Sequence, residues 1–157
     1  MKIAVTGASG YLGTGVVKQL CDDGNDVIAA CHSASNLIDC RATVKVGDIF
    51  LYDNPFEELG KPELLLHMAW RNGFVHNDPS HIEDLPKHFE FIKKMTESGV
   101  KQIAVIGSMH EVGFFEGSIK EDTPTHPESL YGISKDALRN LRSEEHTSEL
   151  QIGRAHV

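Results

Sequence analysis

Three side chains in the last third of the sequence have the types and the spacing of a proton-transfer site. Tyr131 and Lys135 stand four residues apart in YGISK, so a helix would present them on one face. A lysine ammonium beside a phenol favours the phenolate, and a tyrosine with its pKa lowered in this way can exchange a proton with a substrate near neutral pH. Ser108 follows the apolar run QIAVIG and can hydrogen-bond the same substrate oxygen.

The Tyr-x-x-x-Lys spacing also arises in many helices as a solvated pair, so its meaning depends on the elements around it. In TGASGYLG, three glycines lie between an expected strand, Lys2–Val5, and an expected amphipathic helix, Tyr11–Asp22. They permit a tight turn, a close approach of phosphate to the backbone, and close packing of helix on strand. A glycine turn that binds nothing is the alternative, but this position favours a dinucleotide with its pyrophosphate at the helix N-terminus. The cofactor-binding residues expected here are Gly7, Ser9, Gly10, Tyr11, Leu12 and Gly13.

The end of the second expected strand bears on the choice between NADP and NAD. An NAD site has an acidic residue about 20 residues after the glycine turn, where it bonds the ribose hydroxyls. Here the strand Asp26–Cys31 is followed by His32 and Ser33, with no carboxylate at that edge. These side chains can hold a 2′-phosphate, so NADP is favoured over NAD, although no arginine stands there. An exposed loop histidine is the alternative for His32.

The rest of the chain alternates short β-branched runs with longer amphipathic ones. This alternation predicts parallel strands joined by right-handed helical crossovers, and therefore an α/β, doubly wound sheet of the Rossmann type. On the first helix, the residues expected to face the core are Leu12, Val16, Val17 and Leu20. Further strands are expected at Ala42–Val46, Glu63–Met68 and Gln102–Gly107, and further helices at Pro55–Leu59, Ile82–Ser98 and Tyr131–Leu141.

In order and spacing, these motifs resemble the N-terminal part of an extended short-chain dehydrogenase/reductase of the NAD(P)-dependent epimerase/dehydratase family. The resemblance covers residues 1–141 and is carried by several segments together. They are TGASGYLG, GDI (Gly47–Ile49), HMAW (His67–Trp70), GSMHEVG (Gly107–Gly113), and Glu121, Asp122 and Pro124 followed by SLYGISK (Ser129–Lys135).

The resemblance implies a role for each matching residue. Tyr131 would be the catalytic acid/base, and Ser108 would bind the reacting oxygen. Lys135 would hold the nicotinamide ribose while lowering the pKa of Tyr131. The remaining cofactor contacts would be Asp48 and Ile49 at the adenine, and Met68 and Ala69 along the cofactor channel.

The sequence departs from the family pattern at several positions. Trp70 stands where a small residue is common and Arg71 follows it, so the substrate side is expected to be unusual. Near Asp84 the family often has a helix asparagine, and this chain has none. His110 and Glu111 either contact substrate or face water, and the sequence leaves both readings open.

Composition narrows the class of protein. The formal charge is −8, the pI is about 5.5 and no Lys/Arg cluster stands out, which argues against nucleic acid or an anionic membrane as the main partner. No apolar run approaches the length of a membrane span. The cysteines fit no metal or redox spacing, so free buried thiols and a cytoplasmic location are expected. No metal is expected either, because no set of ligands accompanies the loop histidines in HNDPSH.

The C-terminal run from Arg142 to Val157 is polar and lacks the helical pattern expected there. Arg142–Leu150 can be written with the codons AGA TCG GAA GAG CAC ACG TCT GAA CTC. The same string read two bases later, ATC GGA AGA GCA CAC GTC, encodes Ile152–Val157. It resembles a sequencing-library adapter, so residues 142–157 are interpreted as a non-native tail and residues 1–141 as a C-terminally truncated dinucleotide-binding domain. A natural polar C-terminus is the alternative.

Together, the residues and the resemblance imply an NAD(P)-dependent oxidoreductase or epimerase that acts on a nucleotide-activated sugar. A keto-sugar reductase with Tyr131 as acid/base is favoured, because a dehydratase usually needs an Asp/Glu pair and only Glu111 stands near Ser108. The alternatives are a non-catalytic NAD(P)-binding regulatory protein, or a fragment that is inactive as written. The family often forms dimers, so a homodimer is one expectation, and the sequence leaves the oligomeric state open.

Overall fold

Five parallel strands form the centre of the molecule. The computed structural model describes residues 1–120 and 122–145 of the chain. The strands lie in the order β3-β2-β1-β4-β5, so the chain moves outward from β1 in one direction and then returns to continue in the other. Their bounds are β1 Lys2–Thr6, β2 Asp26–Cys31, β3 Thr43–Val46, β4 Leu64–His67 and β5 Gln102–Val105.

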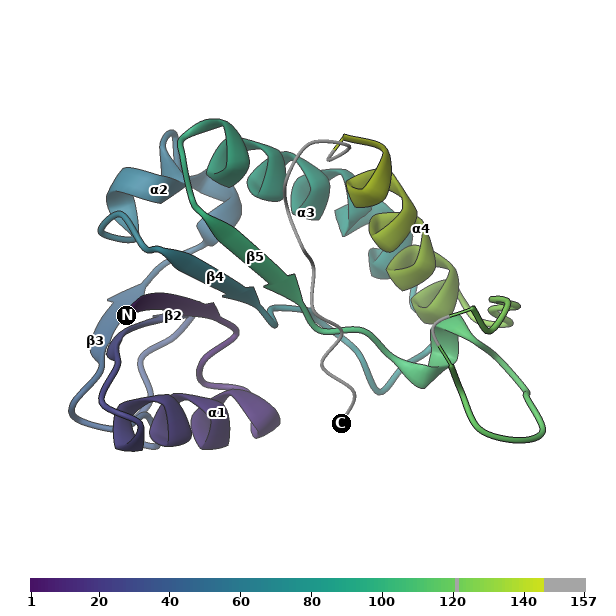
Figure 1. Cartoon of the computed structure of the whole chain (residues 1–157), viewed down its shortest axis with the longest axis horizontal. Coiled ribbons are helices and arrows are strands. Elements are labelled where there is room, and N and C mark those ends of the chain that lie inside the picture. The colour runs from purple at the N-terminus through teal and green to yellow at the C-terminus, as the bar shows by residue number, and fades with distance from the viewer. Residues whose placement is uncertain (121, 146–157) are drawn as a thin grey trace.

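Helices cover both faces of this sheet, as Figure 1 shows: α1 lies on one face, and α3 with α4 beside it lies on the other. This arrangement confirms the expected doubly wound α/β fold. The helices are α1 Tyr11–Asp22, α2 Pro55–Glu58, α3 Ser80–Glu97 and α4 Leu130–Glu145, with short 3-10 turns at η1 Ile49–Leu51 and η2 Met109–Glu111. Within the described ranges, no helix combines the length and apolar character that crossing a bilayer requires.

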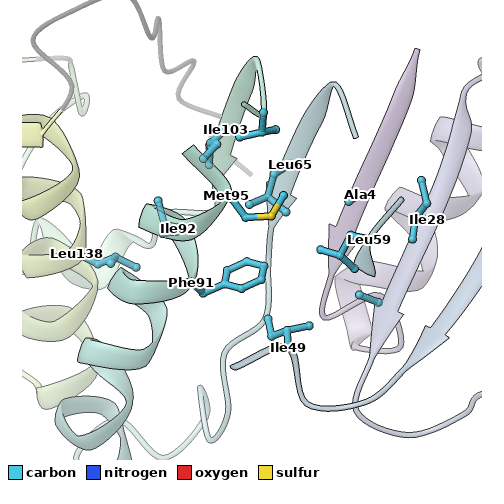
Figure 2. Packing of buried hydrophobic residues seen from close by; sticks show 12 residues of the cluster. Ala4, Ile28, Ile49, Leu59, Leu65, Phe91, Ile92, Met95, Ile103 and Leu138 are labelled. Carbon is cyan, nitrogen blue, oxygen red and sulfur yellow. The ribbon is translucent and has the colours of Figure 1, made fainter. Parts of the chain in front are cut away.

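The core has two parts, one on each face of the sheet. Successive side chains of a strand point to opposite faces, so Ile3 and Val5 of β1 pack toward α1 while Ala4 packs toward α3. In Figure 2, Phe91 and Met95 of α3 point toward the sheet. The apolar residues of the strands and those of the helices therefore pack against each other in the same two buried layers.

Several expectations differ from the structure. The buried residues of α1 are Gly13, Val17 and Cys21, whereas Leu12 is 45% exposed and does not face the core as predicted. Cys21 and Cys31 are buried free thiols, but Cys40 is exposed, because it lies in the turn before the edge strand β3.

The helix α4 ends at Glu145, four residues beyond the expected end at Leu141. Arg142 to Glu145 therefore continue its backbone. The remainder of the tail, residues 146–157, lies outside the described residues, so its interpretation as adapter-derived stays a prediction.

The glycine turn between β1 and α1 is a set of close backbone contacts. Gly7 has φ +68, and a Cβ there would lie 2.8 Å from the backbone nitrogen of Ala69, just beyond β4. A Cβ on Gly13 would lie 2.2 Å from the carbonyl oxygen of Gly7. Only a hydrogen atom fits at the Cβ position of each of these glycines. Their absence of side chains lets the first turn of α1 pack directly against the loop that follows β1.

Gly13→Ala should destabilise the protein by roughly 1–3 kcal/mol or more, because the new methyl group cannot fit against the turn. Gly15→Ala is the matched control: Gly15 lies in the same helix, and nothing stands within 4 Å of its Cβ position. That control should stabilise the helix by about 0.5–1 kcal/mol. Urea unfolding measures both changes, and equal effects at the two positions would contradict this account of the turn.

Candidate functional site

A cleft opens at the carboxyl ends of β1, β2 and β4, where the strand order reverses direction. Such a reversal leaves a crevice because the connections from neighbouring strands diverge to opposite faces. The cleft has a volume of about 450 Å³. Its lining residues are Gly7, Ser9, Gly10, Ala30, Cys31, His32, Gly47, Asp48, Ile49, Phe50, Met68, Ala69, Trp70, Arg71, Asp84, Lys87 and His88.

Most of the cofactor contacts expected from the sequence meet in this cleft. Eight of them line it: Gly7, Ser9, Gly10, His32, Asp48, Ile49, Met68 and Ala69. Tyr11, Leu12, Gly13, Ser33 and Lys135 are not part of the lining. Gly13 packs against the carbonyl oxygen of Gly7 in the turn, and Tyr11 is 89% exposed at the start of α1.

The glycine end of the cleft fits a phosphate group. Gly10 is the N-cap of α1 and has no side chain to cap it, so the N–H groups of the first turn remain available to an anion. At the other end, where the nucleoside is expected, Asp48 holds η1 by accepting a hydrogen bond from the N–H of Phe50 at 3.0 Å, and Ile49 belongs to the buried core. The residues present therefore suit a dinucleotide laid across the strand ends.

Opposite the glycine turn, the cleft carries a charged cluster that the sequence analysis did not identify as a site. Asp84 of α3 is only 5% exposed and binds Arg71 through two hydrogen bonds and Lys87 at 2.7 Å. Burial by itself would raise the pKa of Asp84, but the hydrogen bonds from Lys87 and Arg71 outweigh it and hold that pKa below its usual value. The spacing of Asp84 and Lys87 was a readable signal for one of these ion pairs.

Ser108 and Glu111 together shape the turn after β5. The Ser108 side chain accepts a hydrogen bond from the N–H of His110 at 3.2 Å, and the Glu111 carboxylate accepts one from the N–H of Ser108 at 2.7 Å. Glu111 is buried, so it does not face water, and it fixes the backbone of Ser108. The pattern S-x-x-E was a readable signal for this capping box. His110 is exposed at the turn.

Tyr131 lies at the start of α4 inside a group of aromatic rings. His76, His110 and Trp70 lie 5.9, 5.5 and 6.0 Å from it between ring centroids. Burial raises the pKa of Tyr131 above its ordinary value of 10.0, although a hydrogen bond with Ser108 opposes the shift. The structure thus brings together Tyr131 and Ser108 as the sequence predicted.

Lys135 lies on the same helix face, but its ammonium is directed elsewhere. It donates a hydrogen bond to the carbonyl oxygen of Ile106 at 2.9 Å and lies 4.2 Å from the centre of the Trp70 ring. Its distance to the centre of the Tyr131 ring is 5.9 Å. The expectation that Lys135 lowers the pKa of Tyr131 is wrong for this arrangement, because burial of the phenol prevails.

A buried hydrogen-bond chain runs from β1 to the wall of the cleft. Thr6 accepts hydrogen bonds from the N–H groups of Met68 and Ala69, both at 3.1 Å, so its own hydroxyl proton is directed to His67 Nδ1 at 2.8 Å. His67 Nε2 then donates to His88 Nδ1 at 2.8 Å. Burial, reinforced by the Lys135 charge, lowers the pKa of His88 to about 3.

The structure offers no support for a metal centre: across residues 1–120 and 122–145, no three His, Cys, Asp or Glu side chains are grouped to hold an ion. The turn carrying His32 and Ser33 contains no carboxylate, and only His32 of this pair lines the cleft. The arginine and lysine of the lining, Arg71 and Lys87, form ion pairs with Asp84.

The fold and the cleft define a dinucleotide-binding domain of the Rossmann type. Comparison with known sequences makes this more specific: the sequence model of the NAD dependent epimerase/dehydratase family matches residues 3–148. The chain belongs to this family, as the resemblance of its motifs implied.

Two curated relatives illustrate the range of the family. A dTDP-6-deoxy-L-talose 4-dehydrogenase (NAD(+)) from Aggregatibacter actinomycetemcomitans is 42% identical over 143 residues, which are 88% of this chain and 53% of the relative. A UDP-glucose 4-epimerase from Lacticaseibacillus casei is 28% identical and matches 90% of this chain and 46% of its own length. The chain therefore spans about half the length of these relatives.

Solved structures agree on the fold. MoeE5 in complex with UDP-glucose and NAD has a TM-score of 0.81 at 22% identity, over 98% of this chain and 53% of that one. A UDP-glucose 4-epimerase has a TM-score of 0.79 at 23% identity, over 96% and 49%. The relative most similar of those described here uses NAD by its name, so the comparisons do not support the expected preference for NADP.

The pKa of His88 leads to a prediction about stability. In the folded protein His88 stays neutral down to about pH 3, whereas in the unfolded chain it takes up a proton below its ordinary pKa of 6.5. The unfolded state then binds more protons, so stability should fall as the pH is lowered from 6.5 toward 3. His88→Gln should reduce that slope by up to about 1.4 kcal/mol per pH unit.

The measurement is the free energy of unfolding in urea at a series of pH values. His32→Gln is the control, because His32 is exposed and lies in a loop. An unchanged slope in the His88 variant, or an equal change in both variants, would contradict the assignment of this slope to His88.

Proposed function

We propose that the protein is an NAD-dependent oxidoreductase that acts on a nucleotide-activated sugar, with a keto-sugar or the matching alcohol as the reacting group. The observation that carries the proposal is the meeting of two sets of residues at one edge of the sheet. Trp70 lines the cleft, its ring lies 6.0 Å from that of Tyr131 between centroids, and Tyr131 forms a hydrogen bond with Ser108. The proposed proton-transfer residues are therefore neighbours of the cleft.

The roles follow from this geometry. NAD, when bound, supplies the hydride acceptor or donor. Tyr131 gives a proton to the carbonyl oxygen of a keto-sugar, or removes one from the corresponding alcohol, and Ser108 orients that oxygen by a hydrogen bond. Glu111 keeps the Ser108 backbone in place for this contact. The relative named as a 4-dehydrogenase supports dehydrogenase or reductase chemistry. The relative named as an epimerase supports a second candidate function, epimerisation through a transient keto-sugar.

The cofactor proposed is NAD, in place of the NADP favoured by the sequence. A relative that is 42% identical is an NAD(+) enzyme by its name, and the similar MoeE5 structure contains NAD. The cationic residues that line the cleft, Arg71 and Lys87, are paired with Asp84.

The match covers about half the length of the relatives. The proposed activity is that of a protein of their full length. For the chain of 157 residues alone, we expect cofactor binding without turnover, and a homodimer and a cytoplasmic location remain predictions.

Cofactor binding can be tested by exchanging glycines. Gly7→Ala should weaken NAD⁺ binding at least about tenfold, because its Cβ would enter the backbone of Ala69 and displace the phosphate loop. Gly24→Ala is the matched control: Gly24 also has a positive φ of 79, but nothing lies within 4 Å of its Cβ position and it is outside the cleft lining. Calorimetric titration with NAD⁺ and NADP⁺ measures both variants. Tighter binding of NADP⁺ would refute the cofactor assignment.

Catalysis separates the enzyme from a non-catalytic NAD-binding regulator. In the full-length protein, Tyr131→Phe should lower turnover of a dTDP- or UDP-sugar by about a hundredfold or more, because it removes the proton-transfer group. NAD⁺ affinity should change little, since Tyr131 does not line the cleft. Turnover that survives this substitution would exclude Tyr131 as the acid/base.

A further inference from the structure

Trp70 stands between the cofactor cleft and the proton-transfer residues. It lines the cleft together with the glycine turn, and its ring also contacts Lys135 and Tyr131, neither of which lines the cleft. The indole therefore lies between the ammonium of Lys135 and the cleft.

The indole is held by three kinds of contact. Its N–H donates to His81 Nδ1 at 3.0 Å, and since an indole can only donate, His81 Nε2 carries the proton and donates to the carbonyl oxygen of Val75 at 3.0 Å. Its ring stacks on His88 at 4.3 Å between centroids, nearly parallel at 12°. The third contact is the ammonium of Lys135, at 4.2 Å from the ring centre.

Lys135 is held at this place because its charge is satisfied there. The residue is 5% exposed, and its ammonium has the Ile106 carbonyl oxygen and the indole face as partners. A buried ammonium needs such partners to remain charged. In this position the ammonium lies 5.9 Å from the centre of the Tyr131 ring, and the effect of burial on the Tyr131 pKa prevails.

We propose that Trp70 is a positioning residue that keeps Lys135 away from the cleft and couples cofactor binding to the activation of Tyr131. When a dinucleotide fills the cleft as far as Trp70, the indole shifts and the ammonium exchanges it for hydroxyl oxygens of the ligand. Lys135 then lies closer to Tyr131 and favours the phenolate. Proton transfer is thereby restricted to the protein with its cofactor in place. This inference rests on the proposed function and adds a control step to it.

The first test uses the fluorescence of Trp70, which is the only tryptophan of the chain. AMP lacks the nicotinamide nucleotide and should leave the emission unchanged, whereas NAD⁺ should change its intensity or wavelength. Calorimetry on the same samples establishes binding. Absence of NAD⁺ binding would overturn both the proposed function and this inference. Binding of NAD⁺ with unchanged emission would overturn the inference alone.

The second test compares Trp70→Leu with Trp70→Phe. Both variants lose the hydrogen bond to His81 and keep an apolar side chain, but only Phe keeps a ring face for the ammonium. Trp70→Leu should bind NAD⁺ about two- to thirtyfold more tightly than Trp70→Phe, the range that the loss of a cation–π contact covers. Equal or weaker binding by Trp70→Leu would show that the indole is only a wall of the cleft.

The pKa of Tyr131 provides a readout that a purely structural role of Trp70 would not move. It is followed by the ultraviolet absorbance of tyrosinate, with the Tyr131→Phe variant subtracted. NAD⁺ should lower this pKa in the parent chain but not after Lys135→Met. A decrease that persists in the Lys135 variant would come from another source and would refute the coupling.

Discussion

The hydroxyl of Thr6 joins the two strands on whose separation the whole site depends. It accepts hydrogen bonds from the N–H groups that follow β4 and gives its own proton to His67, so the carboxyl ends of β1 and β4 are held at one distance. Gly7 can then pass within contact distance of Ala69. The floor of the cleft is thus made by backbone atoms, and any side chain at Gly7 would separate the strands.

A series of side-chain contacts begins at the same hydroxyl and leads to Lys135. His67 binds His88, His88 stacks on Trp70, and Trp70 contacts Lys135. Each buried ring in this series has neighbours that fix its orientation, and burial keeps His88 uncharged beside a lysine. Through these rings, the position of the Lys135 ammonium relative to Tyr131 depends on the spacing of β1 and β4.

Charge in the cleft is distributed in a way that suits a dinucleotide. One wall offers backbone N–H groups at the start of α1, and the other offers Arg71 and Lys87 bound to the buried Asp84. The carboxylate attracts both cations and so offsets the repulsion between them. This cluster combines residues from the turn after β4 and from α3, so its parts are close in space only after α3 has packed on the sheet.

The sequence by itself determined the features that depend on near neighbours in the chain. Strand and helix bounds follow from local periodicity, the glycine turn from the need for positive φ and close contact, and the Tyr131–Lys135 face from helical spacing. Tertiary structure alone decided the protonation and partners of the site: burial raises the pKa of Tyr131, and Lys135 binds Ile106, 29 residues away. The reason is physical. Desolvation and charge pairing depend on which atoms surround a group in three dimensions, and no local pattern in the sequence specifies those atoms.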